Sequence, residues 1–269
     1  MTDTRFDVTC IGNAIVDVIA SADDSFLADN EIIKGAMNLV DENRSNSLYE
    51  RMPAGVEQSG GSAGNTAAGI ASLGGRAAYI GKVRDDQLGG IFAHDLRATG
   101  VHFGTPMATT GPSTARCLII VTEDAQRSMN TYLGACVELS PEDIDPEIIA
   151  ASQVTYMEGY LFDPPKAKEA FRRASEIAHA AGRKVSMTLS DSFCVDRYRD
   201  EFREFITSHV DILFGNEDEI KSLYQVESFD DAFQHLRGAC EEVALTRSEK
   251  GAVIVAGDEI HVLDAAPVE

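Results

Sequence analysis

The sequence lacks the usual markers of secretion, membrane insertion and a disulfide-bonded scaffold. Its five cysteines are scattered singly with no C-x-x-C pair, and no run of 18 apolar residues occurs among the 269. The N-terminus MTDTRFD carries no apolar signal segment. An odd number of single cysteines fits reduced thiols, most of them filling the core, better than disulfides or a zinc site. We therefore expect a soluble cytoplasmic protein.

Basic residues are also scarce. The chain has 23 Lys and Arg against 44 Asp and Glu, which gives a net charge of −21. This negative field would repel nucleic acids and anionic membranes, so we expect neither as a partner. An anionic small substrate is still compatible with the composition, because a local basic or dipolar pocket can outweigh the global field.

Several familiar site motifs are missing. The string that comes nearest to a Walker A loop runs from Gly75 to Val83; it has the wrong spacing and no Ser or Thr after Lys82. No G-x-G-x-x-G fingerprint occurs, and the six histidines show no metal-ligand spacing. A nucleotide or metal site of these common types is therefore not expected.

The order of the expected elements indicates an α/β protein. From residue 141 onward, helices (141–152, 165–181, 195–209) alternate with short apolar strands, which predicts a mostly parallel sheet covered by helices on both faces. The strand-like segments 14–19 and 31–40 and the hairpin 114–137 do not fit that alternation. We expect them to form a small β-sheet lid (14–40 and 112–137) beside a core of 1–13, 41–111 and 138–269.

The most informative stretch is the glycine-rich run Ser59-Gly60-Gly61-Ser62-Ala63-Gly64, which leads into an expected helix at 65–73. Backbone N–H groups at such a helix start suit a polar ligand, a phosphate or an oxyanion. The run also matches G-x-S-x-G, the nucleophile elbow of serine hydrolases, with His261 downstream. An elbow needs an apolar strand just before it, whereas segment 55–59 is polar, and no upstream oxyanion loop is evident. A serine hydrolase that uses Ser62 stays an alternative.

Three further polar segments follow expected strands. Asp17 lies in an apolar stretch and would need hydrogen-bond partners if buried, which substrate hydroxyls could supply; with Asn13 it could equally be an ordinary turn residue. The acids of Asn216-Glu217-Asp218-Glu219 suit indirect magnesium or phosphate positioning, or only the dipole of a helix. The loop 245–251 could accommodate a nucleotide or simply join two strands.

Taken together, these segments resemble the PfkB (ribokinase-like) family of carbohydrate and nucleoside kinases over essentially the whole chain. Gly60-Gly61-Ser62-Ala63-Gly64-Asn65-Thr66-Ala67, with Gly74 after it, is similar to the family's N-terminal signature, although Arg84 replaces its last glycine. The segment 216–219 is similar to the family's N-x-x-E motif. Segments 12–17 and 211–217 look most like adenosine kinases. The resemblance implies a ribokinase-like three-layer α/β/α core with a small β-sheet lid.

The resemblance also implies an activity and its residues. The activity is transfer of the ATP γ-phosphate, with Mg²⁺, to a primary hydroxyl of a ribonucleoside (adenosine favoured) or of a sugar, as in ribokinases and fructokinases. The protein would be a monomer or a homodimer. The ribose hydroxyls would be held by Asp17, Gly61, Ser62 and Asn65, with support from Asn13, and the transferring phosphate would be stabilised by Arg127. The base would be lined by Leu133, Ala135 and Leu161, and the nucleotide by Asn216, Thr246 and Gly251. Glu219 would order magnesium through water.

The family's second glycine motif, G-A-G-D, is not found in this sequence. Its aspartate is the general base, and the chain ends at Glu269, about where the motif should begin. Ala256-Gly257-Asp258 is the nearest string, but its strand-like flanks indicate a hairpin turn. Loss of the base and of the anion-hole donors would cost on the order of 10⁴ or more in rate. We expect the 269 residues alone to be inactive, with the base beyond Glu269; a non-catalytic nucleoside-binding protein is a further alternative.

Overall fold

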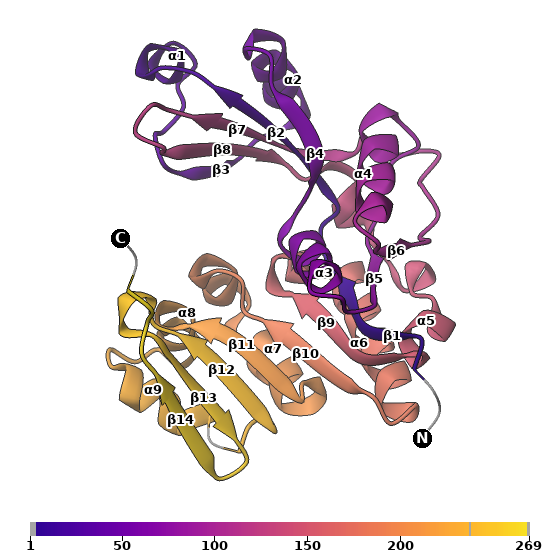
Figure 1. Cartoon of the computed structure of the whole chain (residues 1–269), viewed down its shortest axis with the longest axis vertical. Coiled ribbons are helices and arrows are strands. Elements are labelled where there is room, and N and C mark those ends of the chain that lie inside the picture. The colour runs from indigo at the N-terminus through magenta and orange to yellow at the C-terminus, as the bar shows by residue number, and fades with distance from the viewer. Residues whose placement is uncertain (1–3, 237, 268–269) are drawn as a thin grey trace. The chain divides into compact units, whose positions relative to one another are not determined.

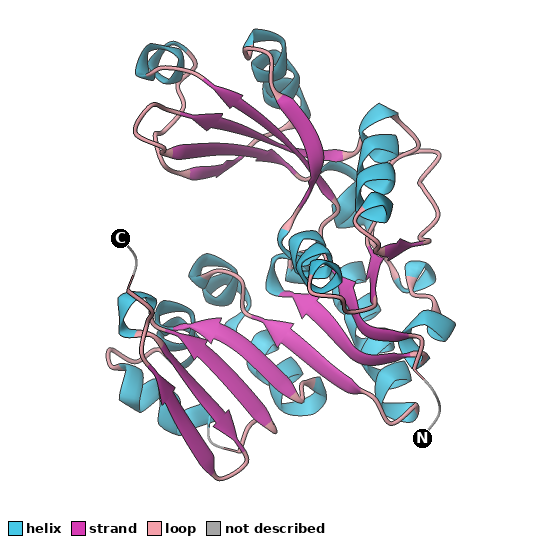
Figure 2. Ribbon diagram, in the orientation of Figure 1, coloured by secondary structure: helices cyan, strands magenta, loops and turns pink. Residues whose placement is uncertain are grey.

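The computed structural model describes residues 4–236 and 238–267, and the chain divides into two compact units. Unit 1 consists of Met1–Ile11 and Ser140–Glu269, and unit 2 of Gly12–Leu139 (Figure 1). Figure 2 shows that both units mix helices and strands. Among the described residues, no helix is long and apolar enough to cross a membrane.

Unit 1 is built on a mostly parallel sheet. The strands run in the order β14-β13-β12-β11-β10-β9-β1, and the five from β12 to β1 are parallel. Most of their apolar residues are buried, as expected of a covered parallel sheet, although Phe214 is 39% exposed. The strands are β1 (Phe6–Ile11), β9 (Ser152–Glu158), β10 (Lys184–Thr188), β11 (Ile212–Asn216), β12 (Glu242–Thr246) and the antiparallel pair β13 (Ala252–Ala256) and β14 (Glu259–Leu263).

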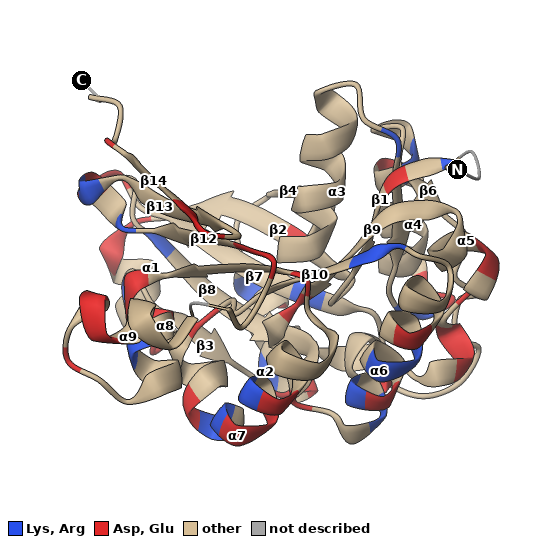
Figure 3. Ribbon diagram, turned by 90° about the horizontal axis from the view of Figure 1, so that it is seen from below, with Lys and Arg blue, Asp and Glu red and all other residues tan. Residues whose placement is uncertain are grey.

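Amphipathic helices connect these strands and pack on them. Helix α6 contacts β9 and β10, and α8 contacts β11 and α7. Both signs of charge alternate along the outer sides of α6 and α7, which keeps those sides hydrated (Figure 3). The helices are α5 (Pro146–Ala150), α6 (Pro165–Ala180), α7 (Ser192–His209), α8 (Glu217–Tyr224) and α9 (Phe229–Leu236).

An aromatic cluster forms the centre of the unit 1 helix layer. Phe162 is 1% exposed, and its ring stacks on Phe202 with the centroids 4.3 Å apart. Phe205 meets the same ring edge to face at 5.7 Å, and Phe171 lies 6.3 Å away. Because these rings come from α6, α7 and the turn after β9, the cluster ties the helices to each other and to the sheet.

Unit 2 contains the smaller sheet, in the order β3-β8-β7-β2-β4. Along β2 the buried residues Val16, Val18 and Ala20 alternate with more exposed ones, so one face is covered and the other is more open. The strands are β2 (Ile15–Ser21), β3 (Met37–Leu39), β4 (Val56–Gly60), β7 (Ala115–Val121) and β8 (Arg127–Tyr132), with a parallel pair β5 (Ala77–Ile80) and β6 (His102–Phe103) elsewhere in the unit.

Four helices complete unit 2. Helix α2 (Glu42–Arg51) covers the closed face of the small sheet, where Arg116 Nε on β7 donates to Ser45 Oγ at 2.7 Å. The others are α1 (Asp24–Asp29), α3 (Ser62–Ser72) and α4 (Gln87–Ala98). Each of α1, α2 and α4 begins at an aspartate whose side chain accepts a hydrogen bond from a first-turn N–H.

The structure confirms the predicted α/β class, with a large, mostly parallel sheet and a second, smaller one. The hairpin 114–137 is present as β7 and β8, although its last residues form a 3₁₀ helix at Gly134–Glu138. The turn at Gly257, between β13 and β14, is also confirmed.

Several element predictions were wrong. The expected strand 31–40 shrinks to Met37–Leu39, and the expected helix 141–152 splits into the 3₁₀ turn Pro141–Asp143 and α5. The polar segment before the glycine run is a strand, β4, because it pairs with β2. The division into a core and a lid of 14–40 and 112–137 stays a prediction; the small sheet also includes β4.

The aromatic cluster gives a stability prediction. We expect Phe162→Ala to lower the free energy of unfolding by about 3–5 kcal/mol, because it leaves a cavity among three other rings. Denaturant unfolding followed by circular dichroism measures this loss. Phe193→Ala is the matched control, since Phe193 is 53% exposed and should change stability by less than about 0.5 kcal/mol. Equal losses in the two variants would contradict the prediction.

Candidate active site

The glycine pair at the end of β4 lies against two polar groups. A Cβ built on Gly60 would be 2.3 Å from Asp17 Oδ2, and one on Gly61 would be 2.4 Å from the Asn13 carbonyl oxygen. Gly61 also has a φ of 82°, which side-chain-bearing residues rarely adopt. The two glycines therefore allow the start of α3 to approach the loop after β1 and the carboxylate on β2.

The predicted hydroxyl-binding residues meet at this approach. Asn13 is 3% exposed, next to the Gly12 carbonyl that accepts a hydrogen bond from the Tyr79 hydroxyl at 2.9 Å. Ser62 and Asn65 are exposed on the first turn of α3, whose N-cap Gly61 has no side chain to cap it. Unit 2 thus brings Asn13, Asp17, Gly61, Ser62 and Asn65 to one place, from the loop after β1, from β2 and from the start of α3.

Asp17 is the most unusual acid of this group. Burial raises its pKa from 3.8 to about 6, while the nearby positive charge of Arg127 acts in the opposite direction. No hydrogen bond to the Asp17 carboxylate is found in the described part of the chain. A half-buried carboxylate without a donor is an acceptor available to a ligand.

The strand register shows which side chains share a face with Asp17. Asp17 is level with Cys117 on β7, and Cys117 is level with Thr131 on β8. Because alternate residues of a strand point to the same face, Arg127 also projects from this face, four residues before Thr131. Thr131 Oγ1 donates to Cys117 Sγ at 3.1 Å. The sequence analysis did not identify Cys117 and Thr131; pairing the strands of the hairpin could have found them.

The three residues predicted as apolar walls differ in exposure. Leu133 is half-buried, whereas Ala135 and Leu161 are fully buried. Ala135 N donates to Ser113 O at 2.9 Å, and a Cβ on the preceding Gly134 would be 2.2 Å from that same oxygen. Segment 133–135 is therefore held tightly against the strand end at Ser113, and of the three only Leu133 presents an appreciable surface.

Unit 1 contains an open groove of about 930 Å³. Asn216, Thr246 and Gly251, the predicted nucleotide residues, all line it. Gly251 has a φ of 84°, and a Cβ there would be 1.9 Å from Leu263 O, so this loop packs closely on the end of β14. The groove's volume suits a drug-sized or nucleotide-sized ligand.

Cations on the groove wall were not predicted. Arg247 Nε is 2.9 Å from Glu217 Oε2, and its guanidinium lies 3.8 Å from the centroid of the Phe229 ring. Lys250 Nζ is 3.5 Å from the other Glu217 oxygen. A signal was present in the sequence, because a basic pair in the loop 246–251 is unusual in so acidic a chain.

The N-x-x-E motif forms a capping box at the start of α8. Asn216 Oδ1 accepts from Glu219 N at 2.8 Å, while Asn216 N and Nδ2 donate to the Glu219 carboxylate at 2.9 and 2.8 Å. Glu219 is 6% exposed, and burial raises its pKa. Both oxygens are therefore already engaged, so the carboxylate suits contact with a hydrated ion better than direct ligation.

The described residues contain no group of three or more His, Cys, Asp or Glu that could hold a metal ion. Asp258 lies in the turn between β13 and β14, so Ala256-Gly257-Asp258 is not a helix N-terminus.

The chain matches the model of the pfkB family carbohydrate kinases over residues 6–269. It belongs to this family. It is 60% identical to a solved adenosine kinase from Sinorhizobium meliloti, with a TM-score of 0.89 over 98% of this chain and 81% of that one. A “probable sugar kinase protein” from Rhizobium etli CFN 42 is 56% identical, with a TM-score of 0.90 over the same shares.

Curated relatives are more distant. Fructokinase-1 of Oryza sativa subsp. japonica is 30% identical over 184 residues, which are 66% of this chain and 57% of that protein. The matched region thus spans little more than half the length of this relative. The family membership is consistent with two features of the structure: the groove of unit 1, and the Gly60-Gly61 pair that lies against Asp17 and Asn13. These two features lie toward opposite ends of the matched residues 6–269.

The structure supports one feature of a nucleophile elbow at Ser62, a preceding strand, and does not support its apolar character. A strand does precede Ser62, but β4 is polar, and its Val56 is 62% exposed. In the part of the chain that the structure describes, no hydrogen bond joins Ser62 to a histidine. His261 lies beside Glu259 on β14, with its Nε2 3.3 Å from that carboxylate. The geometry therefore does not favour a hydrolase.

The raised pKa of Asp17 predicts a gain of stability on removal of its charge. Between about pH 4 and pH 6 the folded protein holds more protons at Asp17 than the unfolded chain, so this group lowers stability as pH rises. At pH 8 we expect Asp17→Asn to raise stability by on the order of 1–2 kcal/mol, and Tm by roughly 2–6 °C.

Thermal unfolding at two pH values tests this prediction. Near pH 4 the Asp17 carboxyl is largely protonated, so the variant and the wild type should have similar Tm values. A Tm of Asp17→Asn below that of the wild type at pH 8 would show that the carboxylate is not destabilising.

Proposed function

We propose that this protein is an ATP-dependent kinase that phosphorylates a primary hydroxyl of a ribonucleoside, with adenosine the favoured substrate. The observation that carries the proposal is the Asp17 carboxylate, which lies against Gly60 with its pKa raised and with no protein donor among the described residues. The hydroxyls of a ribose supply such donors. The adenosine kinase that is 60% identical to this chain supports the choice of nucleoside.

In this proposal the residues around the glycine pair hold the ribose. Asp17 accepts hydrogen bonds from two hydroxyls, as a carboxylate can. The backbone at Gly61 and the side chains of Ser62 and Asn65 complete the contacts, and buried Asn13 supports the loop. Leu133, Ala135 and Leu161 are assigned to the apolar wall for the base.

Arg127 is assigned to the phosphoryl group. It is exposed at the start of β8 and projects from the face that carries Asp17. In phosphoryl transfer the negative charge spreads over the phosphoryl oxygens, and a guanidinium can meet two of them at once. Arg127 thus stabilises charge in the transition state, while Asp17 orients the acceptor.

The groove of unit 1 is assigned to ATP. Asn216, Thr246 and Gly251 line it. Acids and bases also line it, and its positive charges come from Lys221, Arg247 and Lys250. Mg²⁺, when bound, would neutralise charge on the phosphates. Glu219 would hold one of its waters, because its oxygens already accept from Asn216. We also propose that the protein binds small molecules only, that it is cytoplasmic, and that it is a monomer or a homodimer.

A sugar kinase of the fructokinase or ribokinase type is the second candidate. The match to a plant fructokinase favours it. Vicinal hydroxyls of a free sugar would satisfy Asp17 as well as those of a ribonucleoside, so the carboxylate does not separate the two classes.

Substrate class is tested by a coupled ADP-release assay on the full-length protein. We expect turnover with adenosine to exceed that with guanosine, inosine, ribose and fructose. The reason is that a site whose polar groups hydrogen-bond one substrate strongly disfavours an analogue that leaves those groups unpaired. Omission of the acceptor measures background ATP hydrolysis. Turnover only with fructose or another free hexose would replace the nucleoside assignment with the sugar one.

Arg127 gives a second kinetic prediction. We expect Arg127→Ala to lower kcat by about 10²–10³, with KM for the nucleoside changed less than about threefold, because the guanidinium acts on charge that develops in transfer. Arg173→Ala, at an exposed position on α6, is the matched control and should leave both constants unchanged. A rise in KM with kcat preserved would assign Arg127 to acceptor binding instead.

A further inference from the structure

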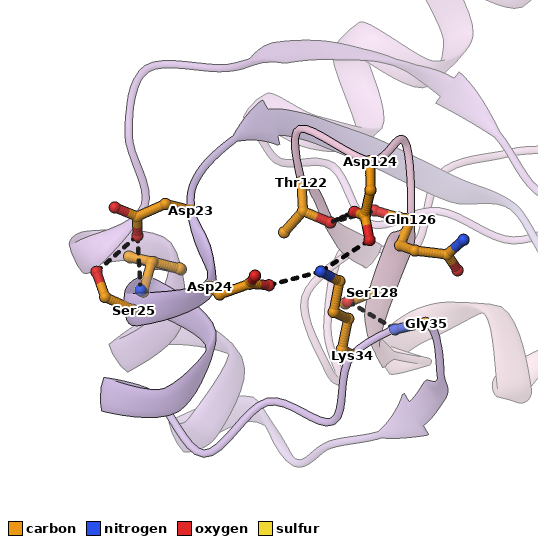
Figure 4. Close-up of polar contacts among 10 residues, drawn as sticks. Asp23, Asp24, Ser25, Lys34, Gly35, Thr122, Asp124, Gln126 and Ser128 are labelled. Atoms are coloured by element: carbon orange, nitrogen blue, oxygen red, sulfur yellow. Dashed lines mark hydrogen bonds and ion pairs between the residues drawn. The ribbon is translucent and has the colours of Figure 1, made fainter.

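A single lysine joins two separate parts of unit 2 beside Arg127. Lys34 Nζ is 2.7 Å from Asp24 Oδ1 on α1 and 2.9 Å from Asp124 Oδ2 in the turn between β7 and β8 (Figure 4). We call these three residues the Lys34 bridge. Arg127 is only three residues after Asp124.

The two carboxylates of the bridge differ in how they are held: Asp124 has a second donor, whereas Asp24 is the first residue of a capped helix. Asp24 begins α1, whose N-cap Asp23 accepts from Ser25 Oγ at 2.7 Å and from Phe26 N at 3.0 Å. Asp124 accepts from Thr122 Oγ1 at 2.6 Å, within a turn closed by Thr122 N to Gln126 O at 3.1 Å. Lys34 therefore meets one carboxylate that Thr122 already holds and a second one whose backbone is fixed at the start of α1.

The pKa shifts of Asp124 and Lys34 both favour their charged forms. The Thr122 hydroxyl and then Lys34 lower the pKa of Asp124 to about 2. Hydrogen bonds to Asp24 and Asp124 raise the pKa of Lys34.

The residues after Lys34 hold the other side of Arg127. Gly35 N donates to Ser128 Oγ at 3.0 Å, and Met129 N donates to Ala36 O at 2.8 Å. Gly35 has a φ of 71°, and a Cβ there would be 3.1 Å from Gln126 Oε1. Segment 34–36 thus contacts the chain both before and after Arg127, and Figure 4 shows two of these contacts, from Lys34 to Asp124 and from Gly35 to Ser128.

We propose that Lys34 is a positioning residue for Arg127: through the Lys34 bridge and the adjoining backbone contacts, segment 34–36 holds the start of β8 so that the guanidinium is aimed for phosphoryl transfer. This rests on the proposed function. Arg127 is exposed and begins its strand, so the direction of its side chain depends on how firmly its own backbone is held. An arginine displaced by about 1 Å loses much of its effect on a transition state.

The kinetic test uses Lys34→Met, which removes the charge and keeps most of the apolar stem. We expect kcat with the nucleoside to fall about threefold to tenfold with KM unchanged, since one partner of an exposed ion-pair network is lost. Lys34→Arg, which can reach both carboxylates, should restore at least half of the wild-type kcat. In an Arg127→Ala background, Lys34→Met should cause no further loss.

Lys184→Met is the matched control. Lys184 also bridges two acids, at 2.8 Å from Glu241 and 3.4 Å from Glu242, and its side chain is exposed to a similar degree. It should leave kcat unchanged. A Lys34→Met enzyme no slower than Lys184→Met, or a loss that persists undiminished without Arg127, would overturn the proposal.

Hydrogen exchange gives a readout that does not need catalysis. We expect the Met129 amide, which donates to Ala36, to exchange about threefold to tenfold faster in Lys34→Met and at the wild-type rate in Lys184→Met. Unchanged exchange would overturn the positioning role even if the protein is an active kinase. Faster exchange in a full-length protein with no kinase activity would support the bridge and refute the proposed function instead.

Discussion

The close approach of the Gly60-Gly61 backbone to two oxygens is the constraint on which the candidate site depends. At either glycine a Cβ would lie within 2.4 Å of a polar oxygen, at Asp17 or at Asn13. Side-chain contacts of that length are essentially never observed, so any larger residue would force β2 or α3 to move. One local restriction thus sets the relative positions of a strand end, a carboxylate and a helix start, which belong to different elements.

This approach has an energetic consequence for Asp17. The backbone that lies against it shields the carboxylate from water without donating to it, and its pKa rises to about 6. A hydroxyl-bearing ligand would donate to the charged form and lower that pKa again. The Asp17 carboxylate therefore favours ligand binding and destabilises the ligand-free protein, which is the usual compromise between stability and function at polar sites.

The sequence predicted the fold best where the signal is local. Alternating apolar strands and helices after residue 140 indicate a parallel sheet. The glycine run before α3 identifies the place where Gly60 and Gly61 lie against Asp17 and Asn13. Val56–Gly60 was missed as a strand because its residues are polar and pairing with β2 stabilises it. The segment 31–40 was taken as a longer strand because only tertiary pairing with β8 limits β3 to Met37–Leu39.

Chemical roles were harder to predict than elements. The same residues, Asn216 and Glu219, satisfy a magnesium motif and a capping box, and the structure shows that the capping box is formed. No pattern at the sequence level separates the two, because both need an amide and a carboxylate three residues apart. The polar loop alone left the roles of Thr246 and Gly251 open, and only the family resemblance assigned them to the nucleotide; they line one groove with Asn216.

Long-range charge pairs were beyond prediction, and the Lys34 bridge shows why. Lys34 and Asp124 are 90 residues apart, and they meet only once β3 pairs with β8. An isolated surface ion pair contributes little, since the entropy lost in ordering two side chains offsets the attraction. Here Thr122 and the turn already hold Asp124, and Asp24 lies at the start of a capped helix, so part of that loss has been incurred before Lys34 binds. A weak interaction can therefore direct an exposed arginine because the stronger backbone pairing beside it does most of the ordering.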